Sequence, residues 1–459
     1  MFIKYNTILI SAPYGTSIRN LIDSNFLTKN NIDKIIYTSS SLPSDFCLNN
    51  NIKIKKYNFI HNITGFIYGI YSGIYTKLLM QSKKLPVFEE IKKNLETENY
   101  LPPIIKRYRY YLNWIPSFLN NQIIFRLLRY ILETLILIFS LKEFFFLIKN
   151  KPNIILFMHF HSNIDKSLFF VAKILKIKTI GMVHSWDNST TKFLVPKNFD
   201  KVLVWNKFVK NEIINVYSYK DEDVKIVGIP QHDTFYEYSI KSNEKEINSV
   251  KEKLKISNNN FIISCFIPSP GLFKFDFVKN FIEDLSEIAN HDINITIIIR
   301  LHPGVKEKYF EKFKGKKNIL LDYPSELYIS DTVKKINVIK DNKILNILNI
   351  SDITINFGST TSLDAAFFNK PILNVSNKKK QNNFYDGFRW QFFWPHYFNL
   401  IRFRGIFIIY NKNDLLKKIN FFKNHKNNWI YKRINNIKNQ FCPFSDGKCG
   451  DRMMAEILN

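Results

Sequence analysis

Cysteine is scarce in this sequence. Four cysteines are spread over 459 residues, and none forms a Cys-x-x-Cys pair or a dense framework. A disulfide scaffold is therefore not expected, and the thiols are typical of free cysteines in a reducing compartment. The start of the chain has only a short apolar run that ends at Pro13 and Gly15, which favours a first β-strand over a signal peptide. These features predict a cytoplasmic protein.

An uninterrupted apolar run long enough to cross a membrane is also lacking. The stretch 127–148 is rich in Leu, Ile and Phe, but Arg129, Glu133, Lys142 and Glu143 interrupt it. Because a spanning helix needs about 20 consecutive apolar residues, we expect a long, partly buried helix instead. Contact of one of its faces with an acidic membrane surface, on the inner side of the membrane, is the alternative to simple burial.

Acidic residues are few beside basic ones. The chain has 39 Asp and Glu against 66 Lys and Arg, a formal net charge of +27. Such a balance favours anionic partners: nucleotides, acidic lipid headgroups or nucleic acid. Lys, Asn and Ile are abundant throughout, however, which is typical of base-composition bias, so charge alone has little weight. No RNA-binding signature, zinc-finger spacing or concentrated basic helix is present, and nucleic acid is not expected as a partner.

Apolar strands alternate with helical stretches along most of the chain. The expected strands are 7–13, 35–40, 52–57, 153–160, 179–184, 202–206, 224–228, 261–267, 295–301, 336–339, 353–357, 372–375 and 406–410. Repeated βα units predict an α/β fold with parallel sheets covered on both faces. A polar stretch at 241–260 divides the chain into two Rossmann-like, doubly wound domains that face each other across a cleft. Residues 1–240 form the acceptor domain, with a helical insertion near 60–150. Residues 241–459 form the nucleotide-donor domain. Packing of its last helix against the N-terminal domain is left as an open alternative.

Two strand ends in the second half carry side chains suited to an anion. Strand 353–357 is followed by Gly358, Ser359, Thr360 and Thr361, where a helix begins. Unpaired N–H groups and the helix dipole make such a turn suitable for a phosphate. An acidic capping box of Thr361 with Asp364 is the alternative that needs no ligand. Strand 295–301 delivers Arg300, His302 and Pro303 to its carboxyl end, where ligands bind in open α/β sheets.

Six short motifs occur in a fixed order over residues 150–459. They are His184-Ser-Trp-Asp-Asn188 followed by Thr190, Thr191 and Lys192; Val204-Trp-Asn206; Gly228-Ile-Pro-Gln-His-Asp233; Arg300-Leu-His-Pro303; Gly358-Ser-Thr-Thr361 with Asp364 and Lys370-Pro371; and Asp446-Gly-Lys448. Together they resemble glycosyltransferases of the two-domain GT-B type, most closely bacterial surface-carbohydrate enzymes related to CDP-glycerol glycerophosphotransferases and HP-motif sialyltransferases.

The resemblance implies a transferase without a cofactor. It would move a sugar or a polyol phosphate from a nucleotide-activated donor to a glycan or lipid-linked acceptor of a surface polysaccharide, such as capsule or lipopolysaccharide. In this family the second domain holds the donor. The resemblance therefore assigns Arg300 and His302 to the donor phosphate, residues 358–361 to helix-start hydrogen bonds, and Asp364 to the ribose hydroxyls. His302 as a structural histidine is the competing interpretation.

The first domain would supply the base that deprotonates the acceptor hydroxyl. Asp187 is slightly favoured over His184 for this role. A simple turn at Asp187, Asn188 and Ser189 explains the same residues without catalysis. Gln231 and His232 follow strand 224–228 and are expected, with Asn188, in the cleft. His159 and His161, which alternate at the end of strand 153–160, are further candidates.

A metal site is not predicted. Asp221-Glu222-Asp223 resembles the DxD signature of metal-dependent sugar transferases, but it falls in a polar turn and a solvated acidic turn is favoured. Two rival functions remain. One is a UDP-N-acetylglucosamine 2-epimerase of the same fold, against which the low density of Asp and Glu at the strand ends argues. The other is a non-catalytic basic scaffold on a membrane surface. Donor, acceptor, stereochemistry and oligomeric state stay open.

Overall fold

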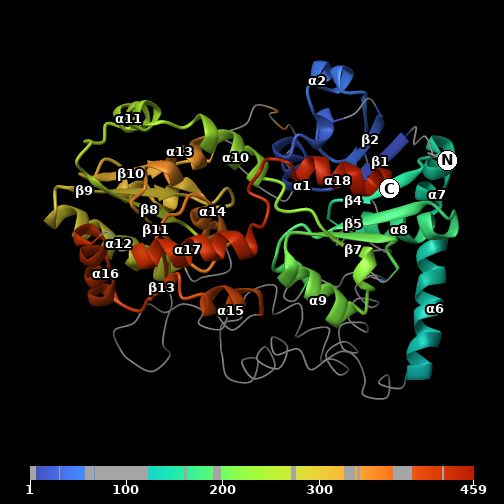
Figure 1. Cartoon of the computed structure of the whole chain (residues 1–459). Helices are drawn as coiled ribbons and strands as arrows, with labels where there is room; N and C mark the ends of the chain where they lie inside the picture. Colours follow the sequence, from blue (N-terminus) through green and yellow to red (C-terminus); the bar gives the residue numbers. More distant parts are fainter. Residues whose placement is uncertain are drawn as a thin grey trace. The chain divides into compact units, whose positions relative to one another are not determined.

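The chain divides into two compact units (Figure 1). The computed structural model describes residues 7–29, 32–56, 67, 122–159, 163–189, 198–269, 275–324, 336, 338, 342–375, 395–425 and 428–459. Unit 1 comprises Met1–Gln231, Asp331–Ile339 and Lys448–Asn459, and unit 2 comprises His232–Ser330 and Lys340–Gly447. The division falls between Gln231 and His232, so the polar stretch 241–260 lies inside unit 2.

Unit 1 is built, within the described residues, on a seven-stranded parallel sheet of order β3-β2-β1-β4-β5-β6-β7. Its strands are β1 (Thr7–Ser11), β2 (Asp33–Thr38), β3 (Ile52–Lys56), β4 (Ile154–Phe157), β5 (Lys178–Met182), β6 (Lys201–Val204) and β7 (Val224–Ile226). Its helices are α1 (Gly15–Asp23), α2 (Ser44–Asn49), α6 (Gln122–Ile138), α7 (Leu141–Asn150), α8 (Asn163–Ile174), α9 (Lys207–Tyr217) and α18 (Cys449–Leu458). Every residue of β4 is buried, as expected for a parallel strand covered on both faces.

Unit 2 holds a six-stranded parallel sheet, again within the described residues, of order β10-β9-β8-β11-β12-β13. Its strands are β8 (Phe261–Phe266), β9 (Ile295–Arg300), β10 (Ile319–Asp322), β11 (Ile353–Asn356), β12 (Ile372–Val375) and β13 (Ile406–Ile409). Its helices are α10 (His232–Lys241), α11 (Glu244–Lys253), α12 (Phe275–His291), α13 (Lys343–Ile350), α14 (Thr361–Phe367), α15 (Pro395–Arg402), α16 (Lys412–Asn424) and α17 (Asn428–Phe441). The prediction of an α/β fold with two Rossmann-like parallel sheets is confirmed.

One predicted strand is wrong. Ile336 and Val338, the described residues of 336–339, lie in no strand. The backbone N–H of Ile336 donates instead to the carbonyl of Ser41, 3.0 Å away. The edge position beside β9 is taken by β10, a short segment that the sequence pattern did not single out.

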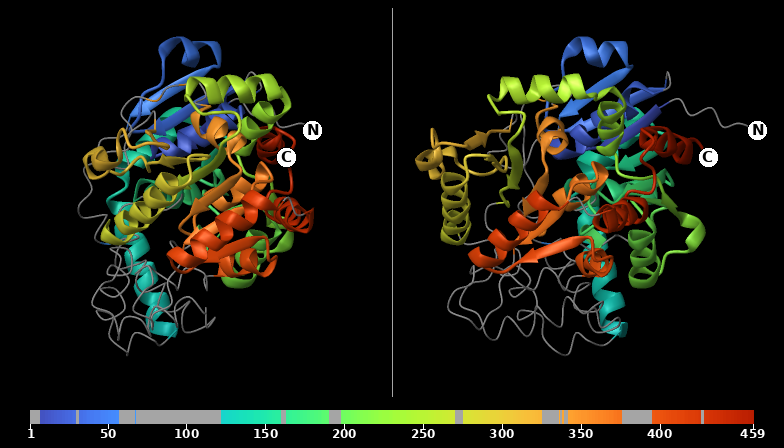
Figure 2. Two further views of the ribbon diagram at one scale, coloured as in Figure 1. Left: turned by 90° about the vertical axis from the view of Figure 1, so that its left-hand side faces the viewer. Right: turned by 60° about the vertical axis from the view of Figure 1, so that its left-hand side comes forward.

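The apolar stretch 127–148 forms two helices where one was expected. Helix α6 ends at Ile138 and α7 begins at Leu141. Ser140 lies at the break, and its hydroxyl donates to the carbonyl of Ile136 at 2.6 Å. In all three ribbon views α6 extends away from the sheet of unit 1 (Figures 1 and 2). In the part of the chain that the structure describes, no helix has both the length and the hydropathy needed to cross a membrane. The rest of the predicted insertion, 57–66 and 68–121, lies outside the described residues.

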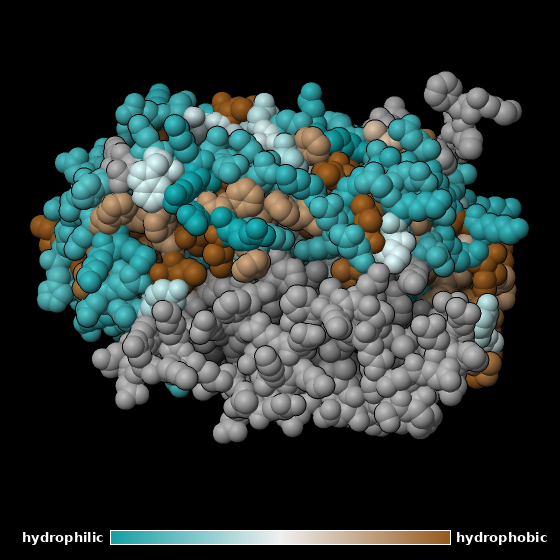
Figure 3. All heavy atoms as spheres, turned by 60° about the horizontal axis from the view of Figure 1, so that its bottom comes forward, coloured by the Kyte–Doolittle hydropathy of each residue, from teal (hydrophilic) through white to brown (hydrophobic). Residues whose placement is uncertain are grey.

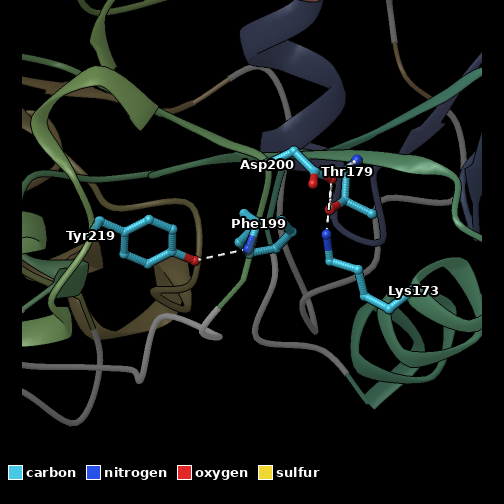
Figure 4. A network of polar contacts seen from close by, with 5 residues as sticks. All are labelled: Lys173, Thr179, Phe199, Asp200 and Tyr219. Atoms are coloured by element: carbon cyan, nitrogen blue, oxygen red, sulfur yellow. Dashed lines mark hydrogen bonds and ion pairs between the residues drawn. The ribbon is translucent and has the colours of Figure 1, made fainter.

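A partly exposed ion pair between Lys173 and Asp200 lies at the amino end of the unit 1 sheet (Figure 4). The carboxylate of Asp200 accepts hydrogen bonds from the N–H and hydroxyl of Thr179, at 2.7 and 2.8 Å, and from Lys173 at 2.9 Å. Next to it, the N–H of Phe199 donates to the hydroxyl of Tyr219 at 3.0 Å. Burial alone would raise the pKa of Asp200, but the bonds from Lys173 and Thr179 hold this pKa below its usual value.

The C-terminal helix α18 packs on unit 1. The N–H of the Arg452 guanidinium, at Nε, donates to the carbonyl of Val227 at 2.8 Å, and Lys201 pairs with Glu456 at 3.0 Å. Gly450 lies against the carbonyl of Ser24 so closely that a Cβ at this position would overlap it. The glycine therefore sets how near the helix can approach the turn after α1.

Candidate functional site

The carboxyl ends of β9 and β10 hold an ion pair in unit 2. Arg300 and Asp322 are the last residues of these neighbouring strands and lie opposite each other in register. The guanidinium of Arg300 donates to the carboxylate of Asp322, and both side chains are largely buried. Because a guanidinium carries five N–H groups, this bond orients Arg300 and leaves further donors for a ligand. Sequence patterns located Arg300 but not its partner.

His302 is a neutral hydrogen-bond donor in the same unit. The N–H of Gly304 donates to His302 Nδ1 at 3.0 Å, across the turn that contains Pro303. Burial lowers the pKa of His302 to about 4, so the ring carries no charge at neutral pH. A neutral imidazole that accepts at Nδ1 has its proton on Nε2. The side chain can therefore offer one N–H to an oxygen atom without adding a positive charge.

The turn after β11 is tied to a side chain of the strand itself. Gly358, at a positive φ of 71°, and Ser359 both donate their N–H groups to Asn356 Oδ1, at 3.0 and 3.1 Å. These two N–H groups, expected to face a ligand, are thus already bonded. Among the described residues no acceptor is found for the N–H groups of Thr360 and Thr361.

Asn356 belongs to a fully buried polar network that sequence patterns missed. Asn374 Nδ2 donates to Asn356 Oδ1 at 3.0 Å, and the hydroxyls of Ser362 and Tyr397 lie 2.8 Å apart. Tyr397 also donates to the side-chain oxygen of Asn374, and burial raises the pKa of its phenol. The network joins β11, β12, α14 and α15, so it fixes the turn before any ligand arrives. Its only signal in the sequence was an Asn inside each of two apolar strands.

Asp364 is bonded to a histidine from the start of α10. Its Oδ1 lies 3.0 Å from Nε2 of His232, which is buried. The ring of His232 stacks on Phe235 and meets Phe367 edge-on, at centroid distances of 4.7 and 5.0 Å. The capping alternative for Asp364 is wrong, because α14 begins after Thr360 with no side-chain capping bond and the carboxylate is directed to His232. The His232 and Asp364 positions, far apart in sequence, are brought together here.

The corresponding edge of unit 1 gathers three rings. His184 follows β5, and its ring lies 4.8 Å from that of His159, which follows β4. His159 in turn meets Tyr14, after β1, with a centroid distance of 4.5 Å. Because β1, β4 and β5 are neighbours in the sheet, their carboxyl ends deliver these rings to one place. His161 lies outside the described residues.

Asp187, Asn188 and Ser189 are buried after β5, where Asp187 lies in a turn and Asn188 and Ser189 have π-helical backbone. The N–H of Asn188 donates to the carbonyl of Ser185 at 3.0 Å. The turn is held from α9 in two ways: the hydroxyl of Ser189 donates to the carboxylate of Glu212, and Tyr217 donates its phenol O–H to the carbonyl of Ser189 at 2.6 Å. These bonds hold the segment in place whether or not Asp187 takes part in catalysis, so the catalytic role and the simple turn both stay predictions.

Glu212 is an acidic residue at this edge that was not singled out from the sequence. Burial raises its pKa to about 8; the bond from Ser189 opposes this rise and the charge of Asp187 adds to it. The signal was available in the helical spacing, since Glu212 stands three residues after Val209 and four before Val216, both buried. An acid within the buried stripe of a helix calls for an explanation.

Two further predicted positions lie elsewhere on these units. Gln231 ends unit 1 and is half-buried, with a buried side-chain oxygen that has no partner among the described residues. Asp221–Asp223 is an exposed single-turn helix before β7, where Asp221 pairs with Lys210 at 2.9 Å. Over the described part of the chain, no three His, Cys, Asp or Glu side chains gather where they could hold a metal ion.

The fold is similar to that of several solved enzymes. A structure of S. aureus MnaA with UDP matches with a TM-score of 0.55 at 11% sequence identity, covering 98% of this chain and 96% of that one. A putative UDP-N-acetylglucosamine 2-epimerase from Listeria monocytogenes matches with a TM-score of 0.56 at 10% identity, covering 99% and 96%. A glycosyltransferase from Rickettsia africae gives 0.53 at 14% identity, covering 99% and 98%. At such identities the likeness concerns the fold alone, which is of the GT-B type as predicted.

No protein of curated function matches the chain. The model of one family, CDP-Glycerol:Poly(glycerophosphate) glycerophosphotransferase, matches residues 173–459. The matched region contains all six motifs from which the resemblance was drawn. Since it also makes up more than half of the sequence, this chain belongs to the CDP-glycerol:poly(glycerophosphate) glycerophosphotransferase family.

Proposed function

We propose that this protein transfers a sugar or a polyol phosphate from a nucleotide-activated donor to a glycan or lipid-linked acceptor in surface polysaccharide synthesis. Family membership supports a transferase of this class. The observation that carries the proposal is the carboxyl edge of the unit 2 sheet. There Arg300 is oriented by Asp322, neutral His302 presents a donor N–H, and a network around Asn356 fixes the turn after β11, which is separated from β9 by β8.

These groups would hold the phosphates of the donor. Arg300 supplies the positive charge, and His302 Nε2 and the hydroxyls of Ser359 to Thr361 supply neutral hydrogen bonds. As the bond to the leaving phosphate breaks, negative charge builds on its oxygen, and donors that are already in place stabilise that charge without reorganising. Because Asp322 and the Asn356 network hold these groups before binding, little order has to be created when the donor arrives.

Unit 1 would supply the base for the acceptor. The acceptor hydroxyl loses its proton as its oxygen attacks the donor carbon or phosphorus, and the nucleotide phosphate departs with the electrons of the broken bond. Asp187 is our candidate to take the proton, and His184 is the alternative. Burial of Asp187 in a turn held by two bonds from α9 supports a fixed position for its carboxylate.

A 2-epimerase is the second candidate, because enzymes of that activity share the fold. Epimerisation needs an acid and a base beside the sugar, and the neighbouring carboxyl groups of Asp187 and Glu212 are compatible with that requirement. Incubation with UDP-N-acetylglucosamine and no acceptor separates the two functions. Formation of an epimer would favour the second candidate, whereas the proposed transferase leaves the sugar unchanged.

An acidic membrane surface is the partner we propose for helices α6 and α7. Their exposed side chains include a set of large apolar residues: Leu127, Tyr130, Ile131, Ile138, Phe139, Leu141, Phe145 and Ile148. Exposed Lys142, Lys149 and Lys151 lie among or beside them. Figure 3 shows hydrophobic atoms gathered at the right-hand edge of the molecule, where α6 lies. Apolar side chains flanked by lysines suit the interface of an anionic bilayer, where a lipid-linked acceptor would be found.

A ligand panel tests the proposed function. Thermal unfolding of the full chain is followed with CDP-glycerol, CMP, CDP, UDP, GDP and their sugars. A ligand that binds only the folded state at 100 times its Kd stabilises it by about 2.7 kcal/mol. We expect one nucleotide family to raise the melting temperature of the chain, and Arg300→Ala to abolish that rise. No rise with any of them, or a rise that survives Arg300→Ala, would count against the donor site.

A further inference from the structure

Glu212 is an acid on α9 with a buried carboxyl oxygen, and it takes no part in the proposed transfer as a base or as a phosphate ligand. We propose that Glu212 positions Asp187: it fixes the turn that carries Asp187 through Ser189, and it keeps the proton of this carboxyl pair so that Asp187 remains ionised. The inference rests on the proposed function, in which Asp187 is the base. Glu212 itself acts through Asp187 and need not touch a substrate.

The first support is the way α9 holds the turn. Glu212 bonds the side chain of Ser189, and Tyr217 bonds its carbonyl at 2.6 Å, so one helix grips one residue at two atoms. The helix is itself well fixed, because the side chain of Asn206 accepts the N–H groups of Phe208 and Val209 at 3.0 and 3.1 Å. A rigid helix start therefore transmits its position to the residues beside Asp187.

The second support is the environment of the Glu212 carboxyl group. Its Oε1 is buried and has no hydrogen-bond partner among the described residues. An ionised oxygen without a partner is costly inside a protein, whereas a protonated carboxyl group costs much less. Burial, and after it the charge of Asp187, raise the pKa of Glu212 to about 8, although the bond from Ser189 acts in the opposite direction. At neutral pH the proton therefore resides on Glu212.

Asp187 and Ser189 are the groups around Glu212 that influence the charge of its carboxyl group. Helix α9 packs on β6 and β7. Among the described residues, Asp187 is the charged group that acts on Glu212, and the hydroxyl of Ser189 is its hydrogen-bond partner. Two carboxyl groups that influence each other take up protons as a pair, and the less favourable site for charge keeps the proton. With the proton on Glu212, Asp187 would be the ionised member of the pair, and such a division into a neutral acid and an ionised base is typical of acid–base sites.

The proposal has a consequence at alkaline pH. Above about pH 8 the second carboxyl group ionises and faces the charge of Asp187. Repulsion between the two carboxylates then weakens the contact by which Glu212 fixes the turn through Ser189. Glu212→Gln keeps the shape and the acceptor oxygen but cannot ionise. Tyr217→Phe is the matched control, since it removes the other bond to Ser189 and leaves the carboxyl pair intact.

Two readouts on the full chain test this without a substrate. The first is the melting temperature from pH 5 to 9.5. Glu212 has a folded pKa above its unfolded value of about 4.3, so it weakens the wild type as pH rises between these values and not beyond. We expect the gap between Glu212→Gln and wild type to widen from pH 5 to about 8 and then stay constant. Tyr217→Phe should be less stable than wild type, and the difference in melting temperature should be similar at every pH.

The second readout is the emission of Trp186, which is 2% exposed in the same turn. It is obtained as the difference between each chain and its Trp186→Phe version. We expect a red shift with a midpoint near pH 8 in wild type and in Tyr217→Phe, and none in Glu212→Gln. A constant stability gap, a shift that persists in Glu212→Gln, or a Glu212→Gln chain that does not fold would each overturn the proposal. Because neither readout uses a nucleotide, such a result would leave the transferase proposal standing.

Discussion

His232 Nε2 lies 3.0 Å from Asp364 Oδ1, although 132 positions separate the two residues in the chain. The imidazole is 2% exposed and packs between Phe235 and Phe367, so it cannot turn toward solvent when its partner is lost. The contact fixes the first residue of α10 to α14, the helix that follows the turn at Gly358. Asp364 is thereby a structural anchor of unit 2 as well as a candidate for the ribose hydroxyls.

Replacing Asp364 by Ala should destabilise unit 2. The change leaves His232 Nε2 buried without its acceptor, which costs about 1–3 kcal/mol. Asp364→Asn keeps an acceptor oxygen and should cost less than half as much. Urea unfolding at pH 7 measures both. If Asp364 also accepts a hydrogen bond from ribose, Asp364→Asn should reduce the free energy of nucleotide binding by more than it reduces the free energy of unfolding. An alanine variant as stable as wild type would refute the anchor role.

His302 should contribute to donor binding without a change in charge. Its pKa of about 4 keeps the ring neutral from pH 5.5 to 8, so this histidine should give nucleotide affinity no pH dependence in that range. Loss of one hydrogen bond to phosphate in His302→Ala should weaken binding on the order of 10- to 100-fold. His302→Gln, which can donate a hydrogen bond from a similar position, should recover part of the lost affinity. Titration calorimetry at several pH values measures this; a dependence centred near pH 6.5 that disappears in His302→Ala would show a charged histidine instead.

Asp200 should stabilise unit 1 above acid pH. Its folded pKa lies below the unfolded value of about 3.9, so its contribution is present above that value and is lost as pH falls through the folded pKa. Because the Asp200 side chain is partly exposed, its ion pair with Lys173 is screened, and we expect Asp200→Asn to cost on the order of 1–2 kcal/mol at pH 7. Unfolding in urea from pH 3 to 7 measures the gap, which should narrow toward pH 3. A gap that grows on acidification would contradict this.

Gly450→Ala should lower the stability of the chain by about 1–3 kcal/mol, since the added methyl group would overlap the Ser24 carbonyl and push α18 outward. Ala455→Ser is the control on the exposed face of the same helix. The melting temperatures of both variants measure this difference in stability. Equal values for the two would mean that the contact between α18 and the Ser24 turn is loose.

Binding to anionic vesicles should depend on α6 and α7. Tyr130→Ser combined with Phe145→Ser removes two side chains that are each 65% exposed and should reduce sedimentation with phosphatidylglycerol vesicles at least tenfold. Leu48→Ser, at a residue 76% exposed on α2, is the matched control and should bind as wild type does. Added salt should weaken binding, because the lysine contribution is screened. Equal losses in both variants would place the membrane contact elsewhere.

The strands were largely predictable because β4, β9 and β11 are short apolar runs with clear ends. β10 was missed and 336–339 was predicted as a strand, because a short apolar run does not show which strand it will pair with: β10 pairs with β9 in unit 2, whereas Ile336 bonds Ser41 in unit 1. Side chains at the strand ends, such as Arg300 and His302, could be located from their position alone. The partners of such residues could not be located: in unit 2 Asp322 bonds Arg300 and Asn374 bonds Asn356, and in unit 1 Glu212 bonds Ser189. Each partner comes from another segment, and a pattern within one segment does not show which distant segment will pack against it.

The return of α18 to unit 1 has a consequence for synthesis. The chain leaves unit 1 at Gln231, contributes Asp331–Ile339 to it and returns for good at Lys448, so the segments of unit 2 are all made before the helix that packs on the Ser24 turn. On the ribosome, the sheet of unit 2 can therefore be complete while unit 1 still lacks α18. A stop codon near the end of the gene would damage the part of the protein that was translated first.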